Sequence, residues 1–134
     1  MKTFQLILIA ADRLFYNGPC VSLTLSGTDG QWGILAGHSP MVVAVVPGEL
    51  RFTREDGREE CVAVGAGLAQ VNERDVLVLA DTIERPEEID ANAARRAMED
   101  AQEALRQQQS QREYRMNKAA LARALGRLKV KNGY

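Results

Sequence analysis

The chain has little of what metal sites and most catalytic sites need. It contains one histidine, two cysteines and no phosphate-binding loop of the P-loop type. Cys20 and Cys61 lie far apart in the sequence without a CxxC spacing, so they lack the pattern of a metal site. We expect both cysteines to be small buried side chains, and the sequence leaves their disulfide state open. These absences argue against a metalloenzyme and against a P-loop nucleotidase.

Long apolar runs are also missing. The longest uncharged one, Met41–Val46, is far shorter than the ~20 residues that cross a bilayer. The apolar N-terminal segment is interrupted by Gln5 and ends at Asp12–Arg13 without a small-x-small cleavage site. We therefore predict a strand there rather than a signal peptide, and a protein that is not exported.

Charge is distributed unevenly along the chain, although the net charge is only −1. Residues 1–86 carry seven basic and eleven acidic side chains, whereas residues 112–134 carry seven basic side chains and one acidic one. Such an asymmetry indicates either an acidic partner or a basic face that is merely solvated. The basic residues singled out are Arg112, Arg115, Lys118, Arg123 and Arg127.

Up to about Ala80 the sequence predicts short strands. Val21–Ser26 alternates apolar and polar residues, which is typical of a strand with one solvated face. Met41–Val46 and Val76–Ala80 are apolar on both faces, and we expect them to lie deep in the packing. Turn residues recur at roughly ten-residue spacing between the segments. This pattern predicts an antiparallel β-sandwich or barrel.

After Arg85–Pro86 the pattern becomes helical. Asp90 is a helix cap, and a first helix is predicted from there to Gln109. A second helix over about Glu113–Val130 places four apolar residues on one face: Tyr114, Leu121, Leu125 and Leu128. The predicted fold class is therefore β + α, with a β-sandwich domain at residues 1–85 and a helical hairpin at 86–134.

His38 lies between Gly37 and Ser39-Pro40. A catalytic histidine needs an orienting partner, and the sequence identifies none, so we interpret His38 as a loop residue bonded to the backbone. A free-standing enzyme using His38 is the less favoured alternative. Another alternative is a nucleic-acid-binding β-barrel with a basic C-terminal helix, although the aromatic residues are few and the β domain is acidic.

The stretch SGTDGQWGILAGHSPMVVAVVPGELR, residues 26–51, resembles the signature region of the epsilon-subunit family of bacterial F-type ATP synthases. That family has a G-x-[DE]-G-x-x-G-I-L/Y-x-G-H-x-P block, then a Pro-Gly turn and a strand. The resemblance extends over essentially the whole chain, with residues 76–82 as the last strand and Ile89–Asp90 at the start of the hairpin. It implies a sandwich of about ten strands followed by a two-helix hairpin.

The resemblance also implies a function and partners. It implies a non-catalytic subunit of the rotating central stalk, bound to the gamma subunit and seated on the c ring at the cytoplasmic face of the bacterial membrane. Two loops would together form the end of the sandwich that contacts these partners, through Asp29, Gly30, Gln31, Trp32, Gly37, His38, Ser39, Pro40 and Met41. Trp32 is either a contact anchor or part of the core.

The family's second helix, when extended, faces acidic segments of the beta (and alpha) subunits and obstructs ATP hydrolysis. The resemblance gives the five basic residues singled out above this inhibitory role. Small alanine contacts along the first helix bury little area, so we expect docking of the hairpin to be worth only a few kcal/mol at ~25 cal/mol per Å². A balance that small can be reversed by a partner.

Some members of the family bind ATP through an I/L-D-x-x-R-A motif. Here Ile89, Asp90 and Ala94 match the motif, but Ala93 stands where it has arginine. With Glu84, these residues would form at most a weak nucleotide site, because neutral alanine cannot replace a guanidinium. We predict weak or no ATP binding and no cofactor, and the sequence leaves proton or sodium coupling open.

Overall fold

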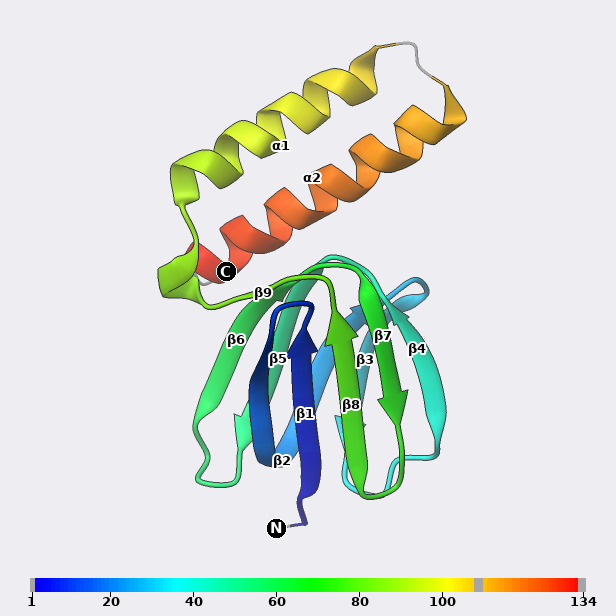
Figure 1. Ribbon diagram of the computed structural model, residues 1–134, viewed down its shortest axis with the longest axis vertical. Coiled ribbons are helices and arrows are strands. Elements are labelled where there is room, and N and C mark those ends of the chain that lie inside the picture. The colour runs from blue at the N-terminus through cyan, green and yellow to red at the C-terminus, as the bar shows by residue number, and fades with distance from the viewer. Residues whose placement is uncertain (1, 108–109, 133–134) are drawn as a thin grey trace.

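The computed structural model describes residues 2–107 and 110–132 of the chain. In these residues nine strands precede a short 3₁₀ helix, η1, and two α-helices (Figure 1). The strands are β1 (Phe4–Ala10), β2 (Arg13–Gly27), β3 (Gly30–Leu35), β4 (Met41–Val45), β5 (Gly48–Arg54), β6 (Glu59–Val64), β7 (Gly67–Val71), β8 (Asp75–Ala80) and β9 (Ile83–Glu84). The helices are η1 (Pro86–Glu88), α1 (Ala91–Arg106) and α2 (Gln111–Asn132).

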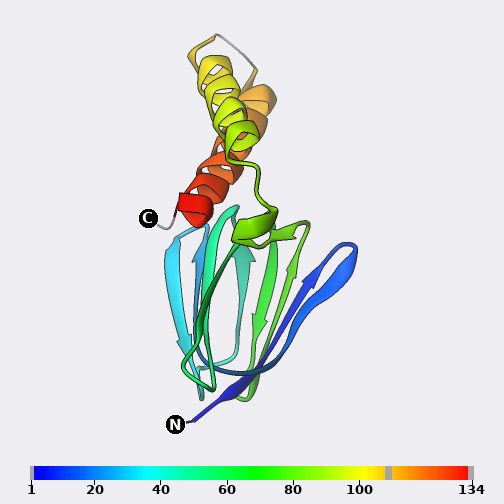
Figure 2. The ribbon, with the colours of Figure 1, turned by 90° about the vertical axis from the view of Figure 1, so that its left-hand side faces the viewer.

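The strands form one sheet that folds over on itself into two layers (Figures 1 and 2). The long strand β2 belongs to both layers, because it pairs with β1 over its first half and with β3 and β5 over its second. Its register shifts between Cys20 and Ser22 without ending the strand. All pairings are antiparallel except that of β1 with β8. The predicted sandwich is confirmed, with nine strands in the described residues rather than about ten.

Alternation along the strands builds the core between the layers. In β1, Phe4, Leu6 and Leu8 are buried, and the residues between them face outward. The prediction that Met41–Val46 and Val76–Ala80 are covered on both faces is wrong. Val42 is 67% exposed and Leu79 is 44% exposed. The hairpin lies over one end of the sandwich, and not across the face that carries these residues (Figure 2).

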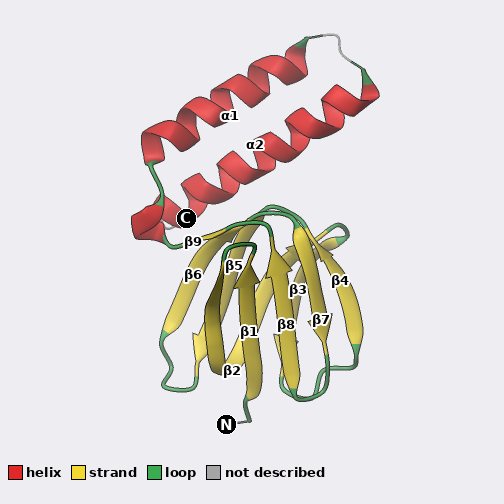
Figure 3. Cartoon of the chain, viewed as in Figure 1, coloured by secondary structure: helices red, strands yellow, loops and turns green. Residues whose placement is uncertain are grey.

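The helices follow all the strands in the chain (Figure 3). Asp90 caps α1 as predicted, since its carboxylate accepts hydrogen bonds from the N–H groups of Asn92 and Ala93. The helix ends at Arg106 with Gln107 as C-cap, and the predicted end at Gln109 lies outside the described residues.

Helix α2 extends two residues beyond the predicted range at each end. Its predicted apolar face is only partly packed, because Tyr114 is 45% and Leu125 is 47% exposed. The residues of α2 that are buried are Ala124, Gly126 and Val130. Two of these three residues, Ala124 and Gly126, are small, and Gly126 lets the backbone of α2 approach the sandwich closely.

Candidate functional site

The two loops expected to form one end of the sandwich lie at opposite ends, so that expectation is wrong. Strand β3 connects them, and at about 3.3 Å per residue it separates them by roughly 16 Å. Gly27 pairs with Val45 at the end of β4, whereas Met41 begins β4. The N–H of Gly37 bonds to the carbonyl of Glu73, far from the hairpin (Figure 1).

The β2–β3 turn lies at the end that the hairpin covers. Gly30 has φ +121°, a conformation that favours glycine, and Asp29, Gly30 and Gln31 are exposed. Trp32 is half-buried: its ring packs against the core, and its Nε1–H donates to Asp29 Oδ1 at 3.0 Å. Trp32 therefore fastens the turn to the core and is not fully buried, and its role as a contact anchor stays a prediction.

The second loop, residues 37–41, is held by its own backbone. Gly37 has φ +82°, and the N–H of His38 bonds to the carbonyl of Leu35. The ring Nδ1 of His38 lies 2.8 Å from the carbonyl oxygen of Ser39. This confirms the interpretation of His38 as a loop residue bonded to the backbone. Pro40 is exposed, and Met41 packs against the core.

An apolar surface that the sequence analysis missed crosses the outer face of five strands. In one row the paired positions are Leu14, Ile9, Leu79, Leu68 and Ala44. The next row holds Ile7, Leu77 and Val42, with the polar residue Gln70 between the last two. We call these eight apolar residues the outer apolar band. Leu14 is 58% and Leu68 is 50% exposed, and a shallow groove of about 340 Å³ lies among the residues of β4, β7 and β8. Contiguous exposed apolar patches of this kind mark interaction sites.

The last third of α2 docks on the sandwich. Arg127 Nε lies 2.6 Å from Glu84 Oε1, and Lys131 Nζ donates to the carbonyl of Pro86 at 3.1 Å. Val130 packs with Ala63 and Ile89 in a small apolar cluster. We call this set of interactions the docking contact.

At the centre of the docking contact two glycines meet. A Cβ placed on Gly126 would lie 2.8 Å from the Cα of Gly48. The glycine at 126 thus allows the backbone of α2 to rest directly on the first residue of β5.

A buried carboxylate lies beside the docking contact. The Glu49 side chain is 8% exposed, accepts a hydrogen bond from the Cys61 thiol at 2.9 Å, and lies 3.5 Å from Lys129 Nζ. Burial opposes ionisation of Glu49, but the Cys61 hydrogen bond and the charges of Arg51 and Lys129 outweigh it and lower its pKa. Burial and the adjacent Glu49 raise the pKa of Cys61 to about 12. Both cysteines are free, and Cys20 is buried as expected, whereas Cys61 is half-buried.

The five basic residues of α2 fall into two groups. Arg112, Arg115 and Lys118 are exposed, and Lys118 Nζ lies 5.7 Å from the centre of the Tyr114 ring. Arg123 is half-buried, and Arg127 pairs with Glu84 in the docking contact. In this arrangement the first group is exposed, whereas Arg127 is held by Glu84.

The four residues of the predicted weak nucleotide site already have internal roles. Glu84 pairs with Arg127, Ile89 and Ala94 are buried, and Asp90 caps α1. Ala93 is exposed and offers no charge. Among the residues that the structure describes, no group of three or more histidine, cysteine or carboxylate side chains is placed to hold a metal ion.

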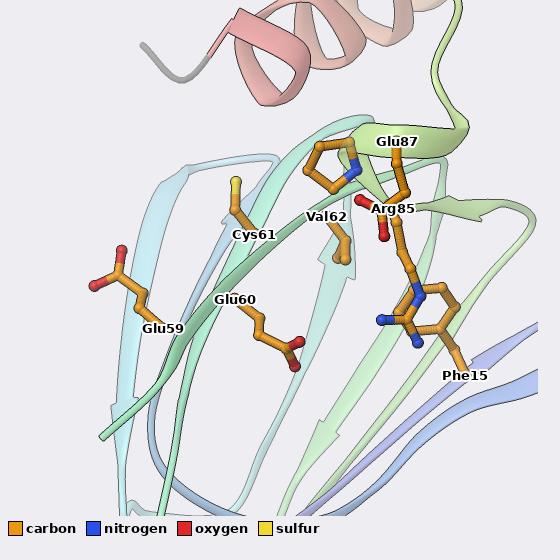
Figure 4. Close-up of a pocket in the computed structure, with 8 residues that line it drawn as sticks. Phe15, Glu59, Glu60, Cys61, Val62, Arg85 and Glu87 are labelled. Carbon is orange, nitrogen blue, oxygen red and sulfur yellow. The ribbon is translucent and has the colours of Figure 1, made fainter. Parts of the chain in front are cut away.

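A cavity of about 310 Å³ lies between β6 and η1 (Figure 4). The guanidinium of Arg85 lies 4.6 Å from the centre of the Phe15 ring. Glu88 ties the linker down, since it accepts hydrogen bonds from the N–H of Arg85 and from Arg13. These same bonds lower the pKa of Glu88. The cavity thus lies where the linker is fastened to the sandwich.

Together with the docking contact and the outer apolar band, it defines a small assembly subunit: a β-sandwich with a docked helical hairpin and an uncovered apolar face.

Comparison with known proteins gives the family. The model described as "ATP synthase, Delta/Epsilon chain, beta-sandwich domain" matches residues 3–86, and that described as "ATP synthase, Delta/Epsilon chain, long alpha-helix domain" matches residues 87–132. The chain belongs to the ATP synthase delta/epsilon chain family. This sets aside the nucleic-acid-binding alternative.

Individual relatives agree with this assignment. The chain is 42% identical over 132 residues to the ATP synthase epsilon chain of Ruminiclostridium cellulolyticum, covering 98% of both chains. It is 36% identical to that of Chromohalobacter salexigens, covering 97% of this chain and 92% of the relative.

Solved structures show the same fold. A chain of the Euglena gracilis mitochondrial ATP synthase OSCP/F1/c-ring structure superposes with a TM-score of 0.80 at 26% identity, covering 91% of this chain and 77% of that one. A chain of the Tetrahymena thermophila mitochondrial ATP synthase central stalk/c-ring structure gives 0.66 at 10% identity, covering 97% of each chain, and shows the fold alone. No helix in the described part of this chain is long and apolar enough to span a bilayer.

Proposed function

We propose that the chain is a non-catalytic rotor subunit in the central stalk of a bacterial ATP synthase, at the cytoplasmic face of the membrane. It couples the c ring and the gamma subunit to the catalytic head, and its hairpin restrains ATP hydrolysis. The relatives named ATP synthase epsilon chain and the likeness to a chain of an F1/c-ring assembly support this role. The sandwich and the hairpin divide at Arg85–Pro86.

The outer apolar band is the observation that carries the proposal. A monomeric protein rarely leaves leucine side chains such as Leu68 and Leu79 uncovered on one face of a sheet. Covering such a face requires a partner protein, and the gamma subunit is the stalk partner that the family resemblance gives. We therefore place gamma on the outer apolar band.

The two loops then contact different partners. The loop at 37–41 leads directly into Val42 of the band, so His38, Ser39, Pro40 and Met41 extend the gamma surface. The β2–β3 turn exposes the polar residues Asp29 and Gln31 at the other end, which suits the polar loops of the c ring.

The hairpin acts as a reversible brake. Undocking breaks the Arg127–Glu84 pair, and adds Arg123 and Arg127 to the exposed cations Arg112, Arg115 and Lys118. The extended α2 then presents all five to acidic segments of the beta (and alpha) subunits. Deleting residues 112–134 should raise ATP hydrolysis by the assembled complex without lowering synthesis. Unchanged ATP hydrolysis after this deletion would refute the proposal that the hairpin restrains hydrolysis.

Binding to gamma tests the role as a rotor subunit. Leu68→Gln removes half-exposed apolar surface from the band, and Leu35→Gln is the matched control because Leu35 is 63% exposed on β3, outside the band. Loss of one leucine contact worth about 1–2 kcal/mol weakens binding roughly 5- to 30-fold. We expect Leu68→Gln to bind gamma that much more weakly and Leu35→Gln to bind as the parent does. Equal binding by both variants would show that gamma does not dock on the band.

A further inference from the structure

A groove runs between the two helices of the hairpin. Its volume is about 510 Å³, within the range of about 300–1,000 Å³ typical of small-molecule sites. Its lining consists of Arg95, Met98, Leu125, Leu128, Lys129 and Asn132. The docking contact and the outer apolar band leave this groove unused.

The floor of the groove is apolar and comes from both helices. Met98 belongs to α1, and Leu125 and Leu128 belong to α2. Leu125 is 47% exposed although it lies well inside its helix. Covering an exposed leucine in a concave surface with an apolar group is favourable, because apolar surface is removed from water.

Two cations, Arg95 and Lys129, belong to the lining of the groove. Arg95 is exposed and makes no hydrogen bond or ion pair within the part of the chain that the structure describes. Lys129 meets Glu49 at 3.5 Å and its side chain is 43% exposed, so this long ion pair leaves ammonium donors free. A lining that combines three apolar side chains with two cations is complementary to a ligand with an apolar body and an anionic end.

We propose that this interhelical groove binds an amphiphilic carboxylate, an alkyl chain with a single anionic head group. The chain covers Met98, Leu125 and Leu128, and the carboxylate lies between Arg95 and Lys129. Because the lining comes from both helices, such a ligand binds the closed hairpin better than one whose helices have separated. At a ligand concentration ten times Kd, the ratio of closed to opened hairpins rises about elevenfold.

Methionine methyl NMR on the purified full chain tests the binding, with octanoate at pH 7 below its micelle concentration as the probe. Met98 lines the groove, whereas Met116 is 60% exposed elsewhere on α2 and Met41 lies at the far end of the sandwich. We expect a saturable shift of the Met98 signal and no shift of the Met116 and Met41 signals. Absence of a Met98 shift, or an equal shift of Met116, would overturn the proposal.

Matched probes and variants separate the contributions of the carboxylate charge and of the alkyl chain to binding. Octanol has the same tail without the charge, and butyrate has the same head group with a short tail; both should bind several-fold more weakly than octanoate. Arg95→Gln should weaken octanoate binding about three- to tenfold, whereas Arg96→Gln, on the neighbouring exposed arginine outside the groove, should leave it unchanged. Equal affinities for octanoate and octanol, or equal effects of the two variants, would contradict the site.

The consequence for the enzyme complex rests on the proposed function, whereas the binding does not. In the assembled complex, octanoate should relieve the restraint on ATP hydrolysis, and Arg95→Gln should reduce that relief. If octanoate binds the groove but does not change ATP hydrolysis, the proposed inhibitory role of the hairpin is contradicted and the assignment of the binding site stands. Binding of an acidic helix of another protein in the groove, without binding of octanoate, would refute the assignment of the groove as a site for amphiphilic carboxylates.

Discussion

Replacing Gly126 by alanine should undock the hairpin without unfolding it. The new Cβ would lie 2.8 Å from the Cα of Gly48 and 3.1 Å from its carbonyl carbon, and these backbone atoms cannot rotate aside. Overpacking of this kind costs about 1–3 kcal/mol. Meanwhile, alanine favours the helix interior by about 1 kcal/mol over glycine, so α2 itself becomes more stable.

The docking contact is weak enough for that cost to matter. Burying Val130 contributes about 1.5 kcal/mol, and the half-exposed Arg127–Glu84 pair adds at most about 1 kcal/mol. A penalty of about 1–3 kcal/mol therefore shifts the ratio of docked to undocked hairpins roughly 5- to 150-fold.

Methyl NMR and circular dichroism read the two effects separately. In Gly126→Ala, the methyl signals of Val130 and Ile89 should move toward the positions of exposed side chains, while helical circular dichroism stays constant or increases. Gly33→Ala is the matched control, because a Cβ there meets nothing within 4 Å. Unmoved Val130 and Ile89 signals in Gly126→Ala would refute the reasoning. So would an equal shift in Gly33→Ala.

Three further outcomes follow from the same contacts. Cys61, with its pKa raised to about 12, should be alkylated slowly by iodoacetamide at pH 8, and Glu49→Gln should speed the reaction about tenfold for each pKa unit restored; an unchanged rate would contradict the Cys61–Glu49 bond. The folded-state pKa of Glu49 is depressed, so its contribution to stability is present above its ordinary pKa of 4.5 and is lost as the pH falls through the lower folded value. Acid should therefore weaken docking as judged by the Val130 signal, and Glu49→Gln should flatten that dependence, whereas Glu99→Gln on the exposed side of α1 should not. Calorimetry on the full chain should detect no submillimolar binding of ATP, since Ala93 offers no cation and Arg127 is held by Glu84; submillimolar affinity would contradict this account.

Local signals predicted the elements better than their arrangement. The cap at Asp90, the strands and the backbone role of His38 depend on residues close in sequence, and the structure confirms them. The relative position of the two contact loops depends instead on β3 connecting opposite ends of the sandwich, which no local pattern specifies.

The outer apolar band shows a second limit. A strand such as Val76–Ala80, apolar on both faces, has the same sequence pattern whether it is buried within one chain or waits for a partner. Its exposed face could be recognised only once the hairpin was seen to lie elsewhere. The role of Gly126 could not be predicted from the sequence either, because it depends on the close approach of Gly48, which is far away in the sequence.

Cysteine cross-linking in the assembled ATP synthase tests most directly whether the chain occupies the rotor position proposed for it. Gln31 and His38 lie at opposite ends of the sandwich. The variants Gln31→Cys and His38→Cys would each be made in a chain whose native cysteines, Cys20 and Cys61, are replaced by alanine. After each introduced cysteine is alkylated with a thiol-reactive photo-cross-linker and irradiated, the account predicts a product between position 31 and the c subunit, and one between position 38 and gamma. Products of both variants with the same partner, or with neither, would contradict it.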